Sequence, residues 1–411
     1  MPKLTTLNVS HDDSASTGSF GTAGSPPPVF DLSHLRFPSL SSIRMSHAST
    51  TPTPALASQL RFLEMKSGIA GASLQLPLEP FLATLGSFAQ LQKLSLTRCF
   101  AAPNDRSTGV PPVARPPLIA SRLTDLAIED YPSSIGRIMS ELVVPSSTNV
   151  FLRGNARGAT VALCWSSFRA MLPHDLQRMD ILSACKSIEV TVTRRACRVY
   201  GSTKGGGDHT SPGMTLELET DFCHTQDHAA HPNAPTARRY ILSFLLSALE
   251  EIFPSSKTVT YLKIHGPVGA VAADDWINAL SPLDNLRHLI VDDEYLVEFP
   301  DRLLDCLRAQ PVEPRGSPPL CPSLDSLELY GDLDFEEEGM AQLERIIATL
   351  QWRRQNEGIT TLRVLNVELF STVALPVQAL EHYRREFYRL TFKSGCFLEV
   401  RVSPLHGRTR A

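Results

Sequence analysis

The residues best suited to chemistry lie in one short stretch and are Cys223, His224, Asp227, His228 and His231. A cysteine thiolate and neutral imidazoles are ligands that zinc prefers, and His224 and His228 would share one face of a helix. Pro232 and Pro235 follow at once, which favours a solvated loop whose side chains lack the outer contacts that orient metal ligands. We therefore expect no metal, no cofactor and no catalytic residue. A metalloprotein or enzyme with a site in the irregular region 149–236 stays as the alternative.

Two further stretches have a composition that suggests a site. Glycines 205–207 beside Lys204 resemble a phosphate-binding loop, but the order G-x-x-x-x-G-K-[ST] is absent and no helix is predicted after them. A hairpin loop is the better interpretation. The acidic residues Asp332, Asp334 and 336–338 lack the spacing of a calcium loop, so we interpret them as a solvated acidic loop.

The stretch 321–331, CPSLDSLELYG, carries the pattern L-x-x-L-x-L at Leu324, Leu327 and Leu329. The last two leucines share one face of an extended segment, and the first packs where the chain enters the strand. The pattern recurs with starts at Leu4, Leu40, Leu60, Leu91, Leu123, Val259, Leu286 and Leu362. A unit this small cannot bury its own apolar face, so its repetition predicts a solenoid of stacked units.

Helices are predicted between these strands, where apolar residues recur at three- and four-residue spacing. The predicted helices are 78–89, 133–144, 236–253, 274–280, 300–310 and 340–357. Strand followed by helix predicts parallel strands joined by right-handed crossovers. The expected fold class is therefore α/β, an irregular leucine-rich-repeat solenoid (horseshoe) with parallel strands on its concave face and helices on its convex face.

The repeat rhythm breaks in the middle of the chain. Segments 149–154 and 159–165 are predicted as short strands, and 186–200 and 214–222 as longer strands that face each other across a Gly-rich loop. The expected organisation is a first, uncapped repeat strand in 1–13, a flexible loop in 14–29, a solenoid over 30–403 with an irregular insert around 149–236, and a flexible tail in 404–411.

Composition and charge narrow the class of protein. The 411 residues are 42% hydrophobic and 20% charged with a net charge of -4, so no global charge draws the chain to nucleic acid or anionic membrane. The eight cysteines form no C-x-x-C pair, which indicates reduced thiols in the cytoplasm or nucleus. No apolar run approaches the roughly 18 residues that span a bilayer.

Five segments follow one another in an order that a known family shares. They are WSSFRAMLPHDLQRMDILSACKSIEVTV, FLLSALEEIFPSSKTVTYLKIHG, DDWINALSPLDNLRHLIVDD, CPSLDSLELYG and RRQNEGITTLRVLNVEL. This order resembles the leucine-rich-repeat portion of basidiomycete (fungal) F-box-type proteins. The resemblance implies that the repeats bind a protein target, while an N-terminal F-box would hold a Skp-type adaptor of a cullin ubiquitin ligase.

The sequence departs from this family in one respect: no F-box precedes the first repeat, which starts at Leu4. We expect the 411 residues to be an N-terminally incomplete reading of a longer protein, or a paralogue that lost its adaptor-binding part. Such a chain would bind its target but no Skp-type adaptor. Segments 172–182 and 299–307 are similar to the start of an F-box, but both sit between predicted repeat strands, which favours ordinary convex helices.

The binding face follows from the strand period. The residue between the two strand leucines points out of the concave sheet, and the residue after them flanks it. The candidate partner-binding residues are Arg44, Glu64, Lys263, Ile290, Asp292, Glu328, Tyr330 and Glu368. They lack the basic and aromatic stripe that nucleic acid needs. We expect a non-enzymatic scaffold for an unknown protein target.

Two expectations refine this face. Its acidic members, with Asp293 and the acids of 332–338, would favour a basic partner surface if they cluster. Only Cys99 occupies the asparagine-or-cysteine position that follows the strand in a regular repeat, which predicts uneven turns.

Overall fold

The computed structural model describes residues 4–9, 38–46, 51–67, 76–101, 118–156, 161–193, 196–206, 211–219, 234–293, 299–308, 319–333, 336–371, 376–391 and 396–402. The chain is an α/β protein with two compact units. Unit 1 comprises Met1–Arg157, Ser166–Ile181 and Pro212–Glu219. Unit 2 comprises Gly158–Trp165, Leu182–Ser211 and Thr220–Ala411.

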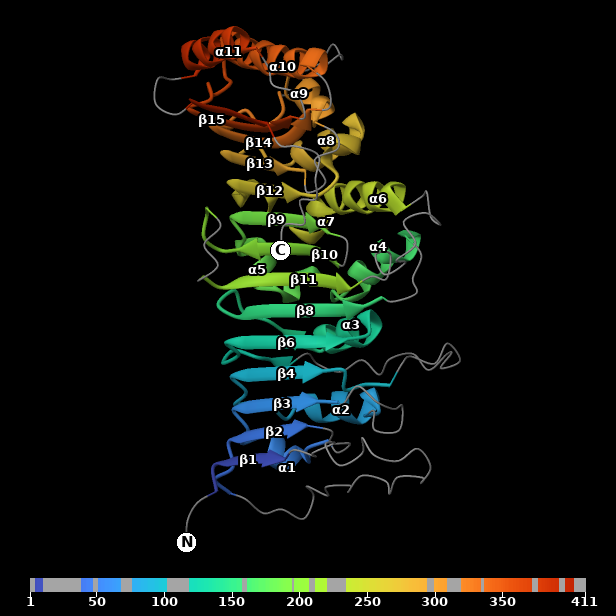
Figure 1. The fold of residues 1–411 in the computed structure, drawn as a ribbon. Coiled ribbons are helices and arrows are strands. Elements are labelled where there is room, and N and C mark those ends of the chain that lie inside the picture. Colours follow the sequence, from blue (N-terminus) through green and yellow to red (C-terminus); the bar gives the residue numbers. More distant parts are fainter. Residues whose placement is uncertain are drawn as a thin grey trace, which may run out of the picture. The chain divides into compact units, whose positions relative to one another are not determined.

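Unit 1 is built on an open parallel sheet (Figure 1). Its strands, in the order in which they pair, are β1 (Thr6–Val9), β2 (Ser42–Ser46), β3 (Phe62–Lys66), β4 (Lys93–Thr97), β6 (Asp125–Asp130), β8 (Asn149–Asn155) and β11 (Gly213–Glu219). Helices α1 (Pro54–Ala57), α2 (Leu78–Leu85) and α3 (Pro132–Ser140) return the chain between strands, as parallel pairing requires. A second, two-stranded sheet pairs β5 (Leu118–Ile119) with β7 (Leu142–Val143).

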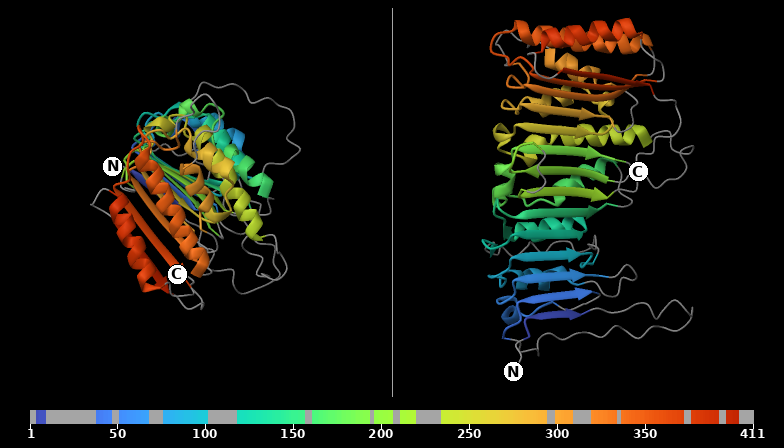
Figure 2. Two further views of the ribbon diagram at one scale, coloured as in Figure 1. Left: turned by 90° about the horizontal axis from the view of Figure 1, so that it is seen from above. Right: turned by 60° about the vertical axis from the view of Figure 1, so that its left-hand side comes forward.

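Unit 2 has a mostly parallel sheet whose strands stack as rungs (Figure 2). In pairing order they are β10 (Ala196–Ser202), β9 (Ser187–Val192), β12 (Tyr261–His265), β13 (His288–Asp292), β14 (Ser326–Leu333), β15 (Val364–Ser371) and β16 (Cys396–Val402). Only the β10–β9 pair among them is antiparallel.

The helices of unit 2 are α6 (Ala234–Ser247), α7 (Leu249–Ile252), α8 (Ala273–Leu280), α9 (Asp301–Arg308), α10 (Glu336–Gln355) and α11 (Val377–Leu390). Helices α8, α9, α10 and α11 pack each on the next, and α6 packs on α8 (Figure 1). Their order follows that of the strands they connect. Each successive strand therefore extends the sheet, and the helix that follows it extends the layer of helices.

The strands predicted from the leucine pattern are confirmed, since all nine predicted positions carry a strand that pairs in parallel with a neighbour. The first strand leucine of six of these patterns is 0–1% exposed: Leu94, Leu126, Leu262, Leu289, Leu327 and Leu365. Every entry residue of the pattern is also buried except Leu4, which is 41% exposed. The first repeat therefore lacks the packing at its entry that the others have.

Two predicted elements are wrong. Segment 159–165 was predicted as a strand, but the chain forms helix α4 (Val161–Ala170). Its apolar residues Val161, Trp165 and Phe168 are spaced by four and three, and this helical period outweighs the short apolar run that suggested a strand. The acids 336–338 were predicted in a loop, but they form the first turn of α10. Glutamate is a good helix former, so this run extends the helix predicted over 340–357 towards its N-terminus.

The middle of the chain departs from the parallel pattern in the way its irregular sequence suggests. Segment 186–200 forms a hairpin of β9 and β10 instead of one long strand, and the Thr193 amide donates to the Ala196 carbonyl across its turn at 2.9 Å. Segment 214–222 contributes β11, which pairs with β8. Strands β8, β10 and β11 have seven residues each, so β8 is longer than the short strand predicted over 149–154, and β14 and β15 have eight.

Side chains at the carboxyl ends of β4 and β6 form hydrogen bonds that stabilise the turns after these strands. Cys99 Sγ donates to the Met65 carbonyl at 3.2 Å, as its position in the pattern suggests. At the end of β6 the buried Asp130 also stabilises a turn. Its carboxylate accepts hydrogen bonds from the Phe100 amide at 3.1 Å and the Tyr131 amide at 2.8 Å. Burial raises the pKa of Asp130 to about 6, although these amide hydrogen bonds lower it.

Asp130→Asn should therefore change stability in a pH-dependent way. An amide has one acceptor oxygen, so the variant loses one of the two bonds and should be less stable by about 1–3 kcal/mol. The raised pKa of Asp130 adds stability at acid pH that is lost as the pH rises through about 6. The deficit of the variant, measured by urea unfolding with circular dichroism, should shrink by about 1 kcal/mol between pH 5 and 7.5. Asp125→Asn on the same strand is the control; a deficit that grows with pH contradicts the assignment.

Candidate protein-binding face

The strands present two different faces because burial alternates along them. In β12 to β15 the two apolar residues that the leucine pattern places in each strand are buried, whereas the residues between them are half-buried; the buried ones are Leu262, Ile264, Leu289, Val291, Leu327, Leu329, Leu365 and Val367. Period-two alternation puts these intervening residues on the opposite face of the sheet from the core. We call this side of the sheet the open face of unit 2, and the corresponding side of the other sheet the open face of unit 1.

Six of the eight predicted residues form two adjacent rows on the open face of unit 2. Strand register places Lys263, Ile290 and Glu328 side by side, between Glu189 on β9 and Asn366 on β15. The next row is Asp292, Tyr330 and Glu368, which His265 precedes. The sequence pattern thus selected neighbouring side chains although they are up to 105 residues apart (368 − 263).

The other two predicted residues lie in unit 1. Arg44 on β2 and Glu64 on β3 are partners in strand register, and Arg44 Nε lies 2.8 Å from Glu64 Oε2. Their side chains are 61% and 38% exposed, so this ion pair contributes little to stability. Both groups remain accessible to a ligand.

The open face of unit 2 is acidic and internally hydrogen-bonded. The Tyr330 hydroxyl donates to Glu328 Oε2 at 2.8 Å, and Asn366 Nδ2 donates to the Tyr330 hydroxyl at 3.1 Å. Burial raises the pKa of Tyr330, and the hydrogen bond to Glu328 and nearby carboxylates, including Glu368 and Asp292, raise it further. These tyrosine and carboxylate groups therefore share one region of negative potential.

Tyr261 and His265 complete this region. Burial raises the pKa of Tyr261 to about 12, with additional contributions from the charges of Glu189 and Glu328. His265 Nδ1 lies 3.0 Å from Asp292 Oδ2. Sequence reasoning did not select Glu189 or Tyr261. The alternation of Ile188, Val190 and Val192 gives the signal for Glu189, because it puts that residue on the opposite face from the core.

Fewer acidic residues can be placed on the open face of unit 2 than the sequence analysis named. Asp292, Glu328 and Glu368 do lie on adjacent strands. Asp293 is only 2% exposed, so it is part of the buried structure and not of the binding surface. The side chains of Asp332 and 336–338 and the whole of Asp334 lie outside the described residues. The part of the prediction that the structure describes therefore rests on three carboxylates.

A row of charges on unit 1 has a different character. Arg98, Glu129, Arg153 and Glu217 alternate in sign from the end of β4 to β11. Arg98 Nε lies 2.9 Å from Glu129, and Arg153 lies 3.7 Å from Glu129 and 3.1 Å from Glu217. Each charge faces an opposite one, so this row supports the sheet and offers a partner no excess charge.

The described thiols do not suit nucleophilic or metal chemistry. Cys99, Cys185, Cys197, Cys306 and Cys321 are free and buried. Burial raises the pKa of Cys99, Cys185 and Cys321 to about 12 and that of Cys306 to about 11, so these thiols stay protonated. The stretch from Cys223 to His231 lies outside the described residues, and within those residues no three His, Cys, Asp or Glu side chains gather as metal ligands would.

Comparison with known proteins adds no identification. No family model matches the chain, and no curated protein matches it. Among the helices that the structure describes, none combines the length and apolar character needed to cross a bilayer.

Proposed function

We propose that this chain is a non-enzymatic protein-binding scaffold of the leucine-rich-repeat type, which holds a protein target on its open sheet faces. The observation that carries the proposal is the strand register. Parallel strands with identical buried positions leave rows of polar side chains aligned across neighbouring repeats. An array of this kind offers a broad, regular surface to another protein, whereas an enzyme needs converging groups in an enclosed pocket.

We further propose that the chain is the target-binding part of an F-box-type substrate receptor that acts in the cytoplasm or nucleus. The order of sequence motifs supports this assignment. Of the two segments similar to an F-box, 299–307 contributes most of α9, which packs between α8 and α10 with Leu303, Leu304 and Leu307 buried. A Skp-type adaptor would have to compete with this packing, which disfavours 299–307 as its binding segment.

The target is proposed to present a basic surface to unit 2, because Asp292, Glu328 and Glu368 give the open face its excess of negative charge. Reversing both Asp292→Lys and Glu328→Lys should weaken binding of the target by about tenfold or more, mainly through slower association. The same loss should appear in the wild type when salt is raised, since exposed charges are screened.

The experiment compares affinity capture from the source organism with the wild type, this double variant and a matched double variant, Glu250→Lys with Asp274→Lys. The control residues are exposed acids on α7 and α8. Quantitative mass spectrometry should find a target that the open-face variant loses and the helix variant retains. Both variants must keep the wild-type unfolding transition. A target that binds all three proteins equally, or is indifferent to salt, refutes the assignment of the face.

A further inference from the structure

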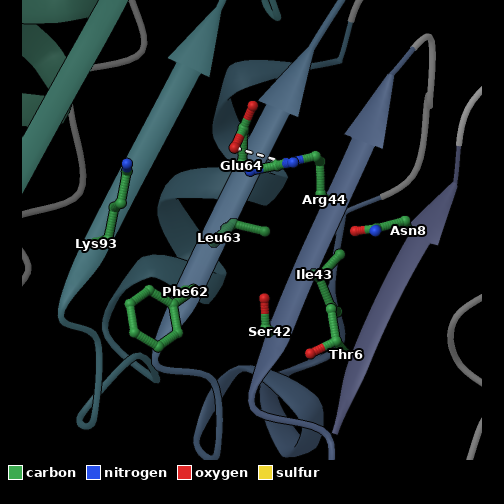
Figure 3. A pocket seen from close by; sticks show the side chains of 9 residues that line it. All are labelled: Thr6, Asn8, Ser42, Ile43, Arg44, Phe62, Leu63, Glu64 and Lys93. Carbon is green, nitrogen blue, oxygen red and sulfur yellow. Dashed lines mark hydrogen bonds and ion pairs between the residues drawn. The ribbon is translucent and has the colours of Figure 1, made fainter. Parts of the chain in front are cut away.

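A hollow of about 310 Å³ opens on the open face of unit 1, over β1 to β4 (Figure 3). Register places Thr6, Ser42, Phe62 and Lys93 in one row across these strands. Asn8, Arg44 and Glu64 form the next row. The hollow arises because Thr6 and Ser42 are small, whereas Phe62 beside Ser42 in the same row and Arg44 two residues further along β2 are large. Its volume is at the lower end of the range for ligand sites, which suits a short segment of a larger molecule.

The lining of the hollow combines donors with one apolar surface. Phe62 is 42% exposed, and the hydroxyl residues Thr6 and Ser42 lie in the same row. Arg44 and Lys93 supply two positive charges, and Glu64 is the only acid among the lining residues. The hollow therefore has a positive excess beside an aromatic ring.

The two cations differ in how far they are already neutralised. Arg44 shares its charge with Glu64 at 2.8 Å. Lys93 belongs to no ion pair among the residues that the structure describes. Its partner in register on β6 is Asp125, which accepts from the Thr124 hydroxyl at 2.9 Å and from Asn149 at 3.4 Å. Lys93 is thus the stronger attractor for an added anion.

We propose that this hollow binds an extended acidic segment of a partner protein, with one carboxylate at Arg44, one at Lys93 and an apolar side chain against Phe62. Arg44 and Lys93 are two strands and two residues of strand apart, so their Cα atoms lie about 12 Å from each other. An extended peptide spans about 10 Å between residues i and i+3, and the long cationic side chains cover the difference. The proposal rests on the proposed function and adds a partner chemistry opposite to that of unit 2.

The probe is a fluorescein-labelled hexapeptide with glutamate at its second and fifth positions, leucine between them and glycine at both ends. Fluorescence polarisation with the full chain should show binding that weakens at high salt. Arg44→Gln, Lys93→Gln and Phe62→Ser should each weaken it at least fivefold. Lys66→Gln, which removes an exposed cation from β3 outside the hollow, should change it less than twofold.

Three results would overturn the proposal. They are equal binding of a peptide with glutamine in place of both glutamates, binding that survives both Arg44→Gln and Lys93→Gln, and no binding of the acidic peptide at all. Circular dichroism confirms that each variant is folded. The test of the proposed function uses Asp292 and Glu328 in unit 2, so the two tests are independent. If those substitutions abolish binding of the target but the acidic peptide does not bind the hollow, the proposed function stands and this site is refuted.

Discussion

Leu327→Ala is expected to lower the free energy of unfolding of unit 2 by about 2–5 kcal/mol. Leu327 is 1% exposed on β14 and is the register partner of Leu289 on β13 and Leu365 on β15. The substitution removes three carbons from a row in which every neighbour is also buried. Repeats that support one another through such rows leave the surrounding side chains little freedom to close the cavity.

Urea unfolding followed by tryptophan fluorescence measures this effect directly, because Trp165, Trp276 and Trp352 all belong to unit 2. Val364→Ala is the matched control, since Val364 begins β15 with 40% of its surface exposed. The control should cost less than about 1 kcal/mol. If Leu327→Ala proves as mild as the control, the stacking of the leucine rows is not what holds the unit together.

The second large effect is expected at Arg353, a cation that is 1% exposed inside unit 2. Its Nη2 donates to the carbonyls of Cys321, Leu324 and Thr360 at 3.0–3.3 Å. These bonds tie the end of α10 to the turn before β14 and the approach to β15. Burial lowers the pKa of Arg353 to about 10, so the guanidinium stays charged at neutral pH.

Arg353→Ala should lower the stability of unit 2 by about 3–5 kcal/mol, because it creates a cavity and leaves buried carbonyl groups without a hydrogen-bond donor. Arg354→Ala is the control on the adjacent residue: Arg354 is exposed and makes a surface hydrogen bond to the Arg389 carbonyl at 2.9 Å. The same fluorescence-monitored unfolding applies. Equal stability of the two variants would show that Arg353 is not needed to hold these turns.

The strands were predictable because L-x-x-L-x-L encodes both the period of a strand and the packing of its entry residue. The end of the chain was not, although α11 buries Tyr383, Phe387 and Leu390 at helical spacing. Five charged residues in the same stretch masked that period, and no leucine pattern marks β16. Helix α4 was missed because a short apolar run is compatible with either kind of element.

The candidate site was predictable only one strand at a time. Alternation says which side chains of a strand leave the core, so Glu328 and Asp292 could be chosen from sequence. It does not give the register between strands that places Glu189 beside Lys263, or Phe62 beside Lys93. The hollow of unit 1 depends on small residues on two strands standing beside large ones on the next, and that juxtaposition exists only in the folded sheet.

The central claim is that a protein target docks on the open sheet face and not on the helices. The most direct measurement places a photo-crosslinking benzoylphenylalanine at Ile290 on β13, or at the exposed Ile277 on α8, and compares the adducts formed with the captured target. We predict an adduct from position 290 that excess unlabelled chain competes away, and none from position 277. Adducts from position 277 alone, or equally from both, would contradict the account.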